Sequence, residues 1–324
     1  MSMVNVTLPD GTVNEYAAGV TAGEVVTDAL GKKHGCLAAR INDVERDLST
    51  ALTDDCHIEG ILAESDEGIH ILRHSAAHLL AQAVMELYPD AKPTIGPAID
   101  RGFYYDFAME PIGEGDLKPI EKKMHEIARR NLKVERVELD DQELRDHFTS
   151  NPYKIEIIDD KLEDGDGSTI YKQGEWYDLC LGPHVPSTAK LMFSRLTSVS
   201  SAYWRGDQSR EQLVRIYGIV EPTKEALKAT LHRMEQAKLR DHRKLGKDLQ
   251  LFHVDEEVGQ GLILWTPRGA IVRQHCKISF HITFADKATI KSSRHILENW
   301  ICIVPLAISH IIRTVSIRHL SSEI

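Results

Sequence analysis

Two short histidine motifs, far apart in the sequence, constrain this chain more than any other feature. The first, HSAAH at residues 74–78, lies in a stretch that has neither Gly nor Pro between Ile69 and Tyr88. The absence of helix breakers over so long an apolar stretch predicts a helix. Because residues four apart lie on one face of a helix, His74 and His78 should point the same way, one turn apart.

The second motif, CLGPH, belongs to the stretch WYDLCLGPHVPST at residues 176–188, which places Asp178, Cys180 and His184 on one Gly- and Pro-punctuated loop. One loop supplies too few ligands to close a metal site, so a partner must lie elsewhere, and HSAAH can provide it. Three His and one Cys would make a tetrahedral ligand set suitable for zinc. They would equally make a metal-free pocket, because neutral imidazoles accept a proton and position a water near pH 7. The sequence leaves both hypotheses open.

Some classes of protein are disfavoured by the composition. The 324 residues are 42% hydrophobic and 27% charged, which is typical of a globular protein with room for more than one domain. The longest apolar run is broken by Pro305 and His310 and is too short to span a bilayer, so no membrane partner is expected. No export signal is recognisable at the N-terminus. Five scattered cysteines indicate reduced thiols, and we expect a cytoplasmic protein.

The net charge of −10 argues against a protein that binds nucleic acid indiscriminately, and we expect no DNA partner. Residues 228–247, KATLHRMEQAKLRDHRKLGK, nevertheless form a local basic segment. This segment is a candidate for contact with an RNA backbone. The alternative is an ordinary solvated helix face.

The organisation of the chain indicates several modules. In the first sixty residues, alternating apolar residues, the Asp10-Gly11 hairpin signal and a Thr21/Glu24 capping box predict a β-grasp-like unit that ends near Leu62. A helix follows at about 117–132, then strand and loop material to about 220. After Pro222 we expect a basic helix to about residue 243. The composition changes after residue 274, and the last fifty residues lack a clear period.

Several motifs together carry a family resemblance: the N-terminal unit, HSAAH, GFYYDF, PYK at residues 152–154, WYDLCLGPH and DHRKLGKDLQLF. They resemble threonyl-tRNA synthetase of the bacterial type over about residues 3–274. The resemblance implies an α+β chain with five parts: a TGS domain, which is a ubiquitin-like β-grasp (1–62), a threonyl/alanyl-tRNA synthetase type editing domain (63–221), a basic linker helix (222–244), the start of the class II aminoacylation core (245–274) and an atypical tail (275–324). The ATP and zinc of the family belong to the core, which we expect to be mostly missing, so ATP-dependent threonylation of tRNA(Thr) is not expected here.

The resemblance also implies an editing site that hydrolyses mischarged Ser-tRNA(Thr) without a required cofactor, although zinc stays an alternative. Its residues would be His74, His78, Lys154, Asp178, Cys180 and His184. A water would be held by His74 and by His184 or Cys180. Lys154 would stabilise developing negative charge or the leaving 3′ oxygen, and Asp178 would orient Lys154 or the substrate amine. The family usually has Arg where this chain has Leu181, which removes the cation from a phosphate or carboxylate contact.

Substrate contacts are expected at two further places. Tyr104 and Tyr105 in GFYYDF would offer an aromatic face to the terminal adenine of the tRNA, or would simply belong to the core. Lys238, Arg240 and Arg243 in the basic segment would contact the tRNA backbone.

Three readings remain open. The chain could be a truncated synthetase that edits in trans beside a full-length synthetase. It could be a non-catalytic tRNA- or RNA-binding module with an idle pocket, or the remnant of a truncated gene. A freestanding alanyl-type editor is disfavoured, because it would not be expected to carry the N-terminal β-grasp unit.

Overall fold

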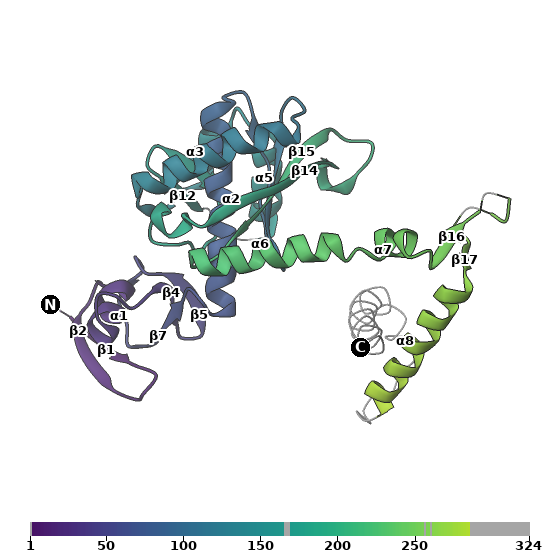
Figure 1. Ribbon diagram of the computed structural model, residues 1–324. Coiled ribbons are helices and arrows are strands. Elements are labelled where there is room, and N and C mark those ends of the chain that lie inside the picture. Colours follow the sequence, from purple (N-terminus) through teal and green to yellow (C-terminus); the bar gives the residue numbers. More distant parts are fainter. Residues whose placement is uncertain (1, 165–168, 256, 260, 286–324) are drawn as a thin grey trace. The chain divides into compact units, whose positions relative to one another are not determined.

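The computed structural model describes residues 2–164, 169–255, 257–259 and 261–285 (Figure 1). The chain divides into two compact units, Met1–Leu227 and Lys228–Ile324, and each is considered by itself. Helices and sheets alternate in the first unit, so the predicted α+β class is confirmed.

The N-terminal domain, residues 2–62, is built on a five-stranded mixed sheet with the strand order β2-β1-β7-β4-β5. Its strands are β1 (Met3–Thr7), β2 (Val13–Ala17), β4 (Cys36–Ile41), β5 (Val44–Asp47) and β7 (Cys56–Leu62). β1 pairs parallel with β7, whereas the other neighbours are antiparallel. The short strands β3 (Val20–Thr21) and β6 (Ala51–Leu52) form a separate ladder.

One helix, α1 (Ala22–Leu30), shares its core with this sheet. The predicted capping box is present, since the Thr21 side chain accepts from Glu24 N–H and the Glu24 carboxylate accepts from Thr21 N–H. Val25 and Val26 of α1 pack with Val4, Val6 and Ile58 of the sheet. The predicted strand alternation therefore directs one face of β1 into this core.

The following part of the first unit, residues 63–221, which we call the second domain, carries the longest helix of the described chain, α2 (Asp66–Leu87). It begins three residues before the predicted stretch because the Ser65 hydroxyl accepts from Gly68 N–H and caps the first turn. Its main sheet has five strands: β8 (Lys92–Pro93), β9 (Ala98–Ile99), β10 (Gly102–Ala108), β14 (Ser194–Tyr203) and β15 (Gln212–Val220). The strand order is β14-β15-β10-β8, and β9 pairs with β10. A second sheet joins β11 (Val134–Glu138), β12 (Thr169–Gln173) and β13 (Trp176–Leu179). Short 3₁₀ turns lie at Glu114–Asp116, Thr188–Leu191 and Trp204–Gly206.

The middle of α2 is buried on all sides, which is expected of a helix that lies inside a core rather than on a surface. It shares one hydrophobic core with β10 and with α3 (Leu117–Arg130), through residues such as Leu80, Phe103 and Met124. The predicted helix at about 117–132 is confirmed and ends at Asn131, whose φ of 52° is left-handed. A helix this well packed is a rigid support for side chains along its length.

The expectation of only strands and loops between about 133 and 220 is wrong. Two helices occur there, α4 (Asp141–Phe148) and α5 (Pro152–Asp164). Asp140 and Glu143 form a capping box at α4. The Asn151 side chain accepts from the N–H of Tyr153 and Lys154, and Pro152 suits the first turn of α5. The local signals for both helices were present in the sequence.

Beyond the second domain, α6 (Lys224–Leu239) ends earlier than the expected residue 243, and α7 (His242–Asp248) starts after the cap of Asp241. A hairpin of β16 (Phe252–Val254) and β17 (Ile263–Trp265) leads to α8 (Pro267–Ala285). α8 crosses residue 274, where the composition changes, and residues 286–324 of the expected tail lie outside the described residues. None of the helices in the described ranges is long and apolar enough to cross a membrane.

Candidate functional site

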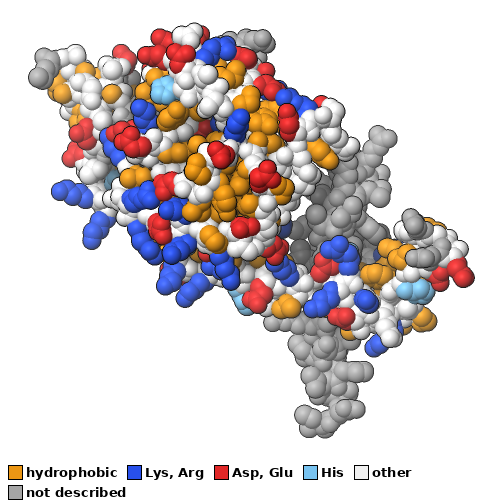
Figure 2. Space-filling model, turned by 90° about the horizontal axis from the view of Figure 1, so that it is seen from above, with side chains coloured by type: hydrophobic (Ala, Val, Ile, Leu, Met, Phe, Trp, Pro, Cys, Tyr) orange, Lys and Arg blue, Asp and Glu red, His pale blue; other side chains and the backbone are white. Residues whose placement is uncertain are grey.

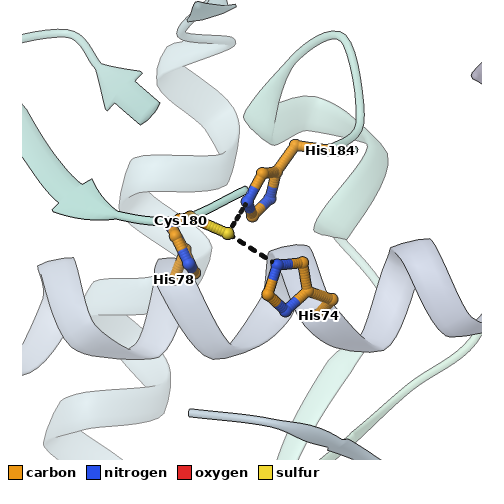
Figure 3. Close-up of side chains that lie close together, drawn as sticks. All are labelled: His74, His78, Cys180 and His184. Atoms are coloured by element: carbon orange, nitrogen blue, oxygen red, sulfur yellow. Dashed lines mark hydrogen bonds between the residues drawn. The ribbon is translucent and has the colours of Figure 1, made fainter. Parts of the chain in front are cut away.

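The two histidine motifs meet in the second domain. α2 contributes His74 and His78, and the loop after β13 contributes Cys180 and His184 (Figure 3). One potential ligand atom from each of the four residues lies within 4.8 Å of the other three. The structure therefore brings together the four residues that the spacing of HSAAH and CLGPH predicted.

The sulfur of Cys180 lies at the centre of this cluster. It is 2.9 Å from Nε2 of His74 and 3.2 Å from Nε2 of His184, and the backbone N–H of Gly182 donates to it at 3.3 Å. Ser75, on α2, orients His184 from the other side: its hydroxyl lies 3.1 Å from Nδ1 of His184. A cysteine sulfur surrounded by nitrogen groups can hold either a proton or a metal ion at this point.

The imidazoles of the cluster are packed against each other. The ring centroids of His74 and His184 are 4.5 Å apart, and those of His78 and His184 are 4.3 Å apart. Burial lowers the pKa of His78 from 6.5 to about 4, and it lowers the pKa of His184 well below its ordinary value. Both rings are therefore neutral near pH 7, which is the form that accepts a proton or binds a metal.

A second cluster lies beside the first. Lys154 of α5 is 2.6 Å from Oδ1 of Asp178, and Tyr105 of β10 donates its hydroxyl proton to Oδ2 of Asp178 at 2.5 Å. The ammonium of Lys154 also donates to the Tyr105 oxygen at 3.1 Å. Burial opposes ionisation of Asp178, but Lys154 and His78 outweigh it and hold the pKa of this carboxyl below its ordinary value. Burial and the neighbouring carboxylate raise the pKa of Tyr105 well above 10, so its hydroxyl stays protonated.

His78 lies between the two clusters. Its Nε2 is 3.9 Å from Oδ2 of Asp178, and both side chains are almost completely buried. Its Nδ1 is buried and has no hydrogen-bond partner within the described part of the chain. A buried imidazole nitrogen without a partner is costly unless a water, a substrate or a metal satisfies it.

The four residues of the first cluster fit a zinc ion. Tetrahedral zinc holds N and S ligand atoms about 3.5 Å apart, which is close to the separations around Cys180 Sγ. Small side-chain movements would bring the four atoms, all within 4.8 Å, onto one ion, and Nδ1 of His78 has no hydrogen-bond partner among the described residues. Ser75 beside His184 supplies the kind of outer contact that orients a ligating histidine.

The sequence prediction gave Ser75 no role in this site, and it did not foresee that Tyr105, one of its core candidates, contacts Asp178. The hydroxyl of Ser75 contacts His184 and accepts from the N–H of Val185 at 3.1 Å. Tyr105 was expected either to stack on a base or to fill the core; it is 1% exposed, and its hydroxyl bonds to Asp178. Ser75 lies within HSAAH, so the motif itself offered a signal for the first of these.

The residues predicted to bind substrate lie in different places. Tyr104 is on the opposite face of β10 from Tyr105, where its ring lies 4.0 Å from the Arg215 guanidinium. In the second unit, Lys238 and Arg240 are exposed, whereas Arg243 is paired with Asp241 at 2.9 Å. The structure thus brings together the six predicted catalytic residues, but not Tyr104.

The surface charge is mixed despite the net charge of −10. Figure 2 shows one face on which acidic side chains are interspersed with hydrophobic ones, while Lys and Arg side chains gather along part of its margin. A polyanion would find local attraction there rather than a uniformly repulsive surface.

Comparison with known proteins places the site in a family. Residues 168–217, which include the Cys180 loop, match the family described as "Threonyl and Alanyl tRNA synthetase second additional domain". The segment that carries Cys180 and His184 is therefore similar to the second additional domain of those synthetases.

Over most of its length, the chain is a relative of the threonyl-tRNA synthetases, as its motifs predicted. It is 46% identical over 277 residues to the threonine–tRNA ligase of Streptococcus thermophilus, a match that covers 84% of this chain and 42% of the relative. The ligase of Chlorobaculum tepidum is 46% identical over 276 residues, covering 83% and 42% of the two chains. That of Streptococcus mutans is 44% identical over 309 residues, covering 94% and 47%. The chain thus spans less than half the length of these relatives.

Proposed function

We propose that this chain hydrolyses the ester bond of mischarged Ser-tRNA(Thr), as an editing domain. The observation that carries the proposal is the position of Cys180 Sγ between Nε2 of His74 and Nε2 of His184, beside a buried Lys154–Asp178 pair. The match of residues 168–217 to the second additional domain supports the same chemistry.

Such an activity is physically needed in this family. Serine and threonine share a hydroxyl and differ by one methyl group, so a synthetic pocket that binds threonine rejects serine by only about 1–3 kcal/mol. A second site that removes serine after transfer, and excludes or misplaces the larger threonine, would correct the remaining error.

In the proposed reaction, a water oxygen attacks the seryl carbonyl carbon, and the bond from that carbon to the 3′ oxygen of the terminal adenosine breaks. A neutral imidazole, His184 or His74, accepts the proton of the water, and the leaving 3′ oxygen receives a proton. Lys154 stabilises the negative charge that develops, while Asp178 holds Lys154 in place. The products are serine and free tRNA.

The proposal requires no cofactor. If zinc is bound, His74, His78, Cys180 and His184 would hold it, and it would supply Lewis-acid polarisation to the site. A histidine nitrogen that held the ion would not also accept the proton of the water, so in that case Lys154 and Asp178 would keep the roles described above and the histidines would serve as ligands.

We also propose roles for the parts around the site. The N-terminal domain is a TGS domain, residues 222–244 form a linker that holds α6 and the start of α7, and residues 245–274 begin a class II core. The partners are tRNA(Thr) and Ser-tRNA(Thr), with a full-length synthetase in trans as an option, and the location is cytoplasmic. Threonylation of tRNA(Thr) is the reaction of the full-length enzymes of the family. The clustered residues around Cys180 and Lys154 support editing instead.

A second candidate is a tRNA- or RNA-binding module without hydrolytic activity. Leu181 favours it, because this side chain is 46% exposed beside Cys180, where the family usually carries Arg. The exposed Lys238 and Arg240 would serve either function.

Deacylation assays with histidine variants separate the two candidates. His74→Ala and His184→Ala should slow the release of serine by about 10²–10⁴-fold while tRNA binding stays largely intact. His70→Ala is the matched control, since His70 lies one turn before His74 on α2 and is exposed. A wild-type chain that binds tRNA(Thr) but releases no serine would establish the binding module instead.

A further inference from the structure

A carboxylate from the N-terminal domain reaches the loop that carries Cys180 and His184. Asp47, the last residue of β5, is 9% exposed. Its Oδ1 accepts the backbone N–H of His184 at 2.9 Å, and its Oδ2 accepts the hydroxyl proton of Tyr171 at 2.6 Å. Each carboxylate oxygen of Asp47 therefore accepts a hydrogen bond from a different segment beside the site, one from the Cys180 loop and one from β12.

Tyr171, which donates its hydroxyl proton to Asp47, also packs against the loop that carries Cys180 and His184. Its ring lies 4.3 Å from the His184 ring, measured between centroids. Its hydroxyl also fills the space beside Gly182, where a Cβ atom would come within 1.8 Å of it, and Gly182 has a φ of +77°. Asp47, Tyr171 and Gly182 thus fix the path of the loop between Cys180 and His184.

The N-terminal domain is well placed to hold Asp47 in this position. Leu37, Ala38 and Ile61 of its sheet belong to the same buried core as Ile71 and Leu72 of α2. Because α2 also carries His74 and His78, the packed interface sets the distance from Asp47 to both halves of the site.

We propose that Asp47 is a positioning residue, through which the N-terminal domain sets the geometry of His184 and Cys180. This inference rests on the proposed editing function for its consequence in catalysis, but the positioning itself is a property of the fold. Asp47 does not touch the reacting atoms. It holds the backbone of His184 so that Nε2 stays 3.2 Å from Cys180 Sγ and Nδ1 stays 3.1 Å from Ser75.

Asp47→Asn tests this role with little change in volume. In the amide, an NH2 group replaces one of the two oxygens, so either the His184 N–H or the Tyr171 hydroxyl loses its acceptor at that position. Glu45→Gln is the matched control, because it makes the same carboxylate-to-amide change on the same strand. Outer contacts of this kind are typically worth about 10–100-fold in activity.

The first readout does not depend on catalytic activity. It is the rate at which iodoacetamide alkylates each cysteine, measured by peptide mass spectrometry. The pH is kept above about 9, where thiols are largely ionised. In Asp47→Asn, Cys180 should react severalfold faster than in the wild type, because its loop is released. Cys36, which is 1% exposed in the N-terminal domain, should react as slowly as before. Glu45→Gln should leave both rates unchanged.

The second readout is steady-state deacylation of Ser-tRNA(Thr). Asp47→Asn should lower kcat about tenfold with little change in KM, since the tRNA contacts lie elsewhere. Unchanged Cys180 alkylation in Asp47→Asn would overturn the inference, as would a parallel rise for Cys36, which would mean that the domain has merely come apart. If the wild type releases no serine, the proposed function fails, and the alkylation result still decides on positioning.

Discussion

Nζ of Lys154 lies 2.6 Å from Oδ1 of Asp178, with both side chains almost fully buried. The two residues come from α5 and β13, and the Tyr105 hydroxyl completes the contact. Because an isolated charge is costly in a protein interior, each of the two ions depends on the other. Asp178 precedes Cys180 by two residues, so this pair also anchors the start of the loop that carries the sulfur.

Removal of either Lys154 or Asp178 should therefore lower the free energy of unfolding strongly. Lys154→Met leaves the Asp178 carboxylate buried without its ammonium, and we expect a loss of about 3–5 kcal/mol in the free energy of unfolding at pH 7. Urea denaturation followed by tryptophan fluorescence measures this. The control is Lys133→Met, which breaks an exposed pair with Glu135 and should cost less than about 1 kcal/mol. Equal stability of the two variants would contradict the assigned role of the buried pair.

Acid should lower the stability of the second domain, because His78 is buried there in its neutral form. Its pKa is lowered from 6.5 to about 4, so the unfolded state binds a proton that the folded state does not. The stability is fully present above pH 6.5 and falls as the pH drops toward 4, by roughly 3 kcal/mol for this residue. His184 adds to the effect, because burial lowers its pKa too.

Urea denaturation at pH 7.5 and pH 5 checks the effect of His78. His78→Gln should lose less stability between the two pH values than the wild type does, whereas His70→Gln, at an exposed position near the start of the same helix, should behave like the wild type. A His78→Gln protein with the full wild-type pH dependence would show that other groups cause the acid sensitivity.

Leu181 offers a test of substrate contact. It is 46% exposed between Cys180 and Gly182, where an arginine would be placed to reach a phosphate of the substrate. Leu181→Arg should lower KM for Ser-tRNA(Thr) by about two- to tenfold at low salt. Leu181→Gln, which is polar but uncharged, should not. If Leu181→Gln lowers KM equally, the lower KM results from removal of the exposed apolar side chain and not from the added positive charge.

The basic segment should govern the salt dependence of tRNA binding. Each lost contact between a cation and a phosphate lowers the slope of log K against log salt concentration by about one. Lys238→Ala and Arg240→Ala should each show this loss in filter binding. Arg243→Ala should show a smaller loss, because Asp241 already pairs with that guanidinium. Unchanged slopes in the first two variants would remove this segment from the tRNA interface.

The parts of the fold that sequence patterns could predict are those with strong local signals. The Thr21/Glu24 capping box, the helix that carries HSAAH and the strand that ends at Leu62 all occur as expected. α4 and α5 were missed although Asp140 and Asn151 cap them, because short charged helices lack a clear apolar period.

The site was only partly predictable for a different reason. HSAAH and CLGPH contain three imidazoles and a thiol, so their residue types alone indicated a shared pocket. The contacts of Asp47 and Tyr105 depend on how distant segments pack, and the sequence patterns gave Asp47 no role and Tyr105 a different one. Tyr105 in particular alternates with Tyr104 on one strand, and only the observed register shows which of the two faces Asp178.

The most direct test of editing is a single-turnover assay with the protein in excess over Ser-tRNA(Thr) or Thr-tRNA(Thr), in which release of the amino acid is followed over time. We predict that serine is released at least about ten times faster than threonine, because a site that excludes one methyl group discriminates by about 1–3 kcal/mol. Equal release of serine and threonine, or release no faster than in buffer alone, would contradict the assignment of His74, Cys180 and His184 to an editing site.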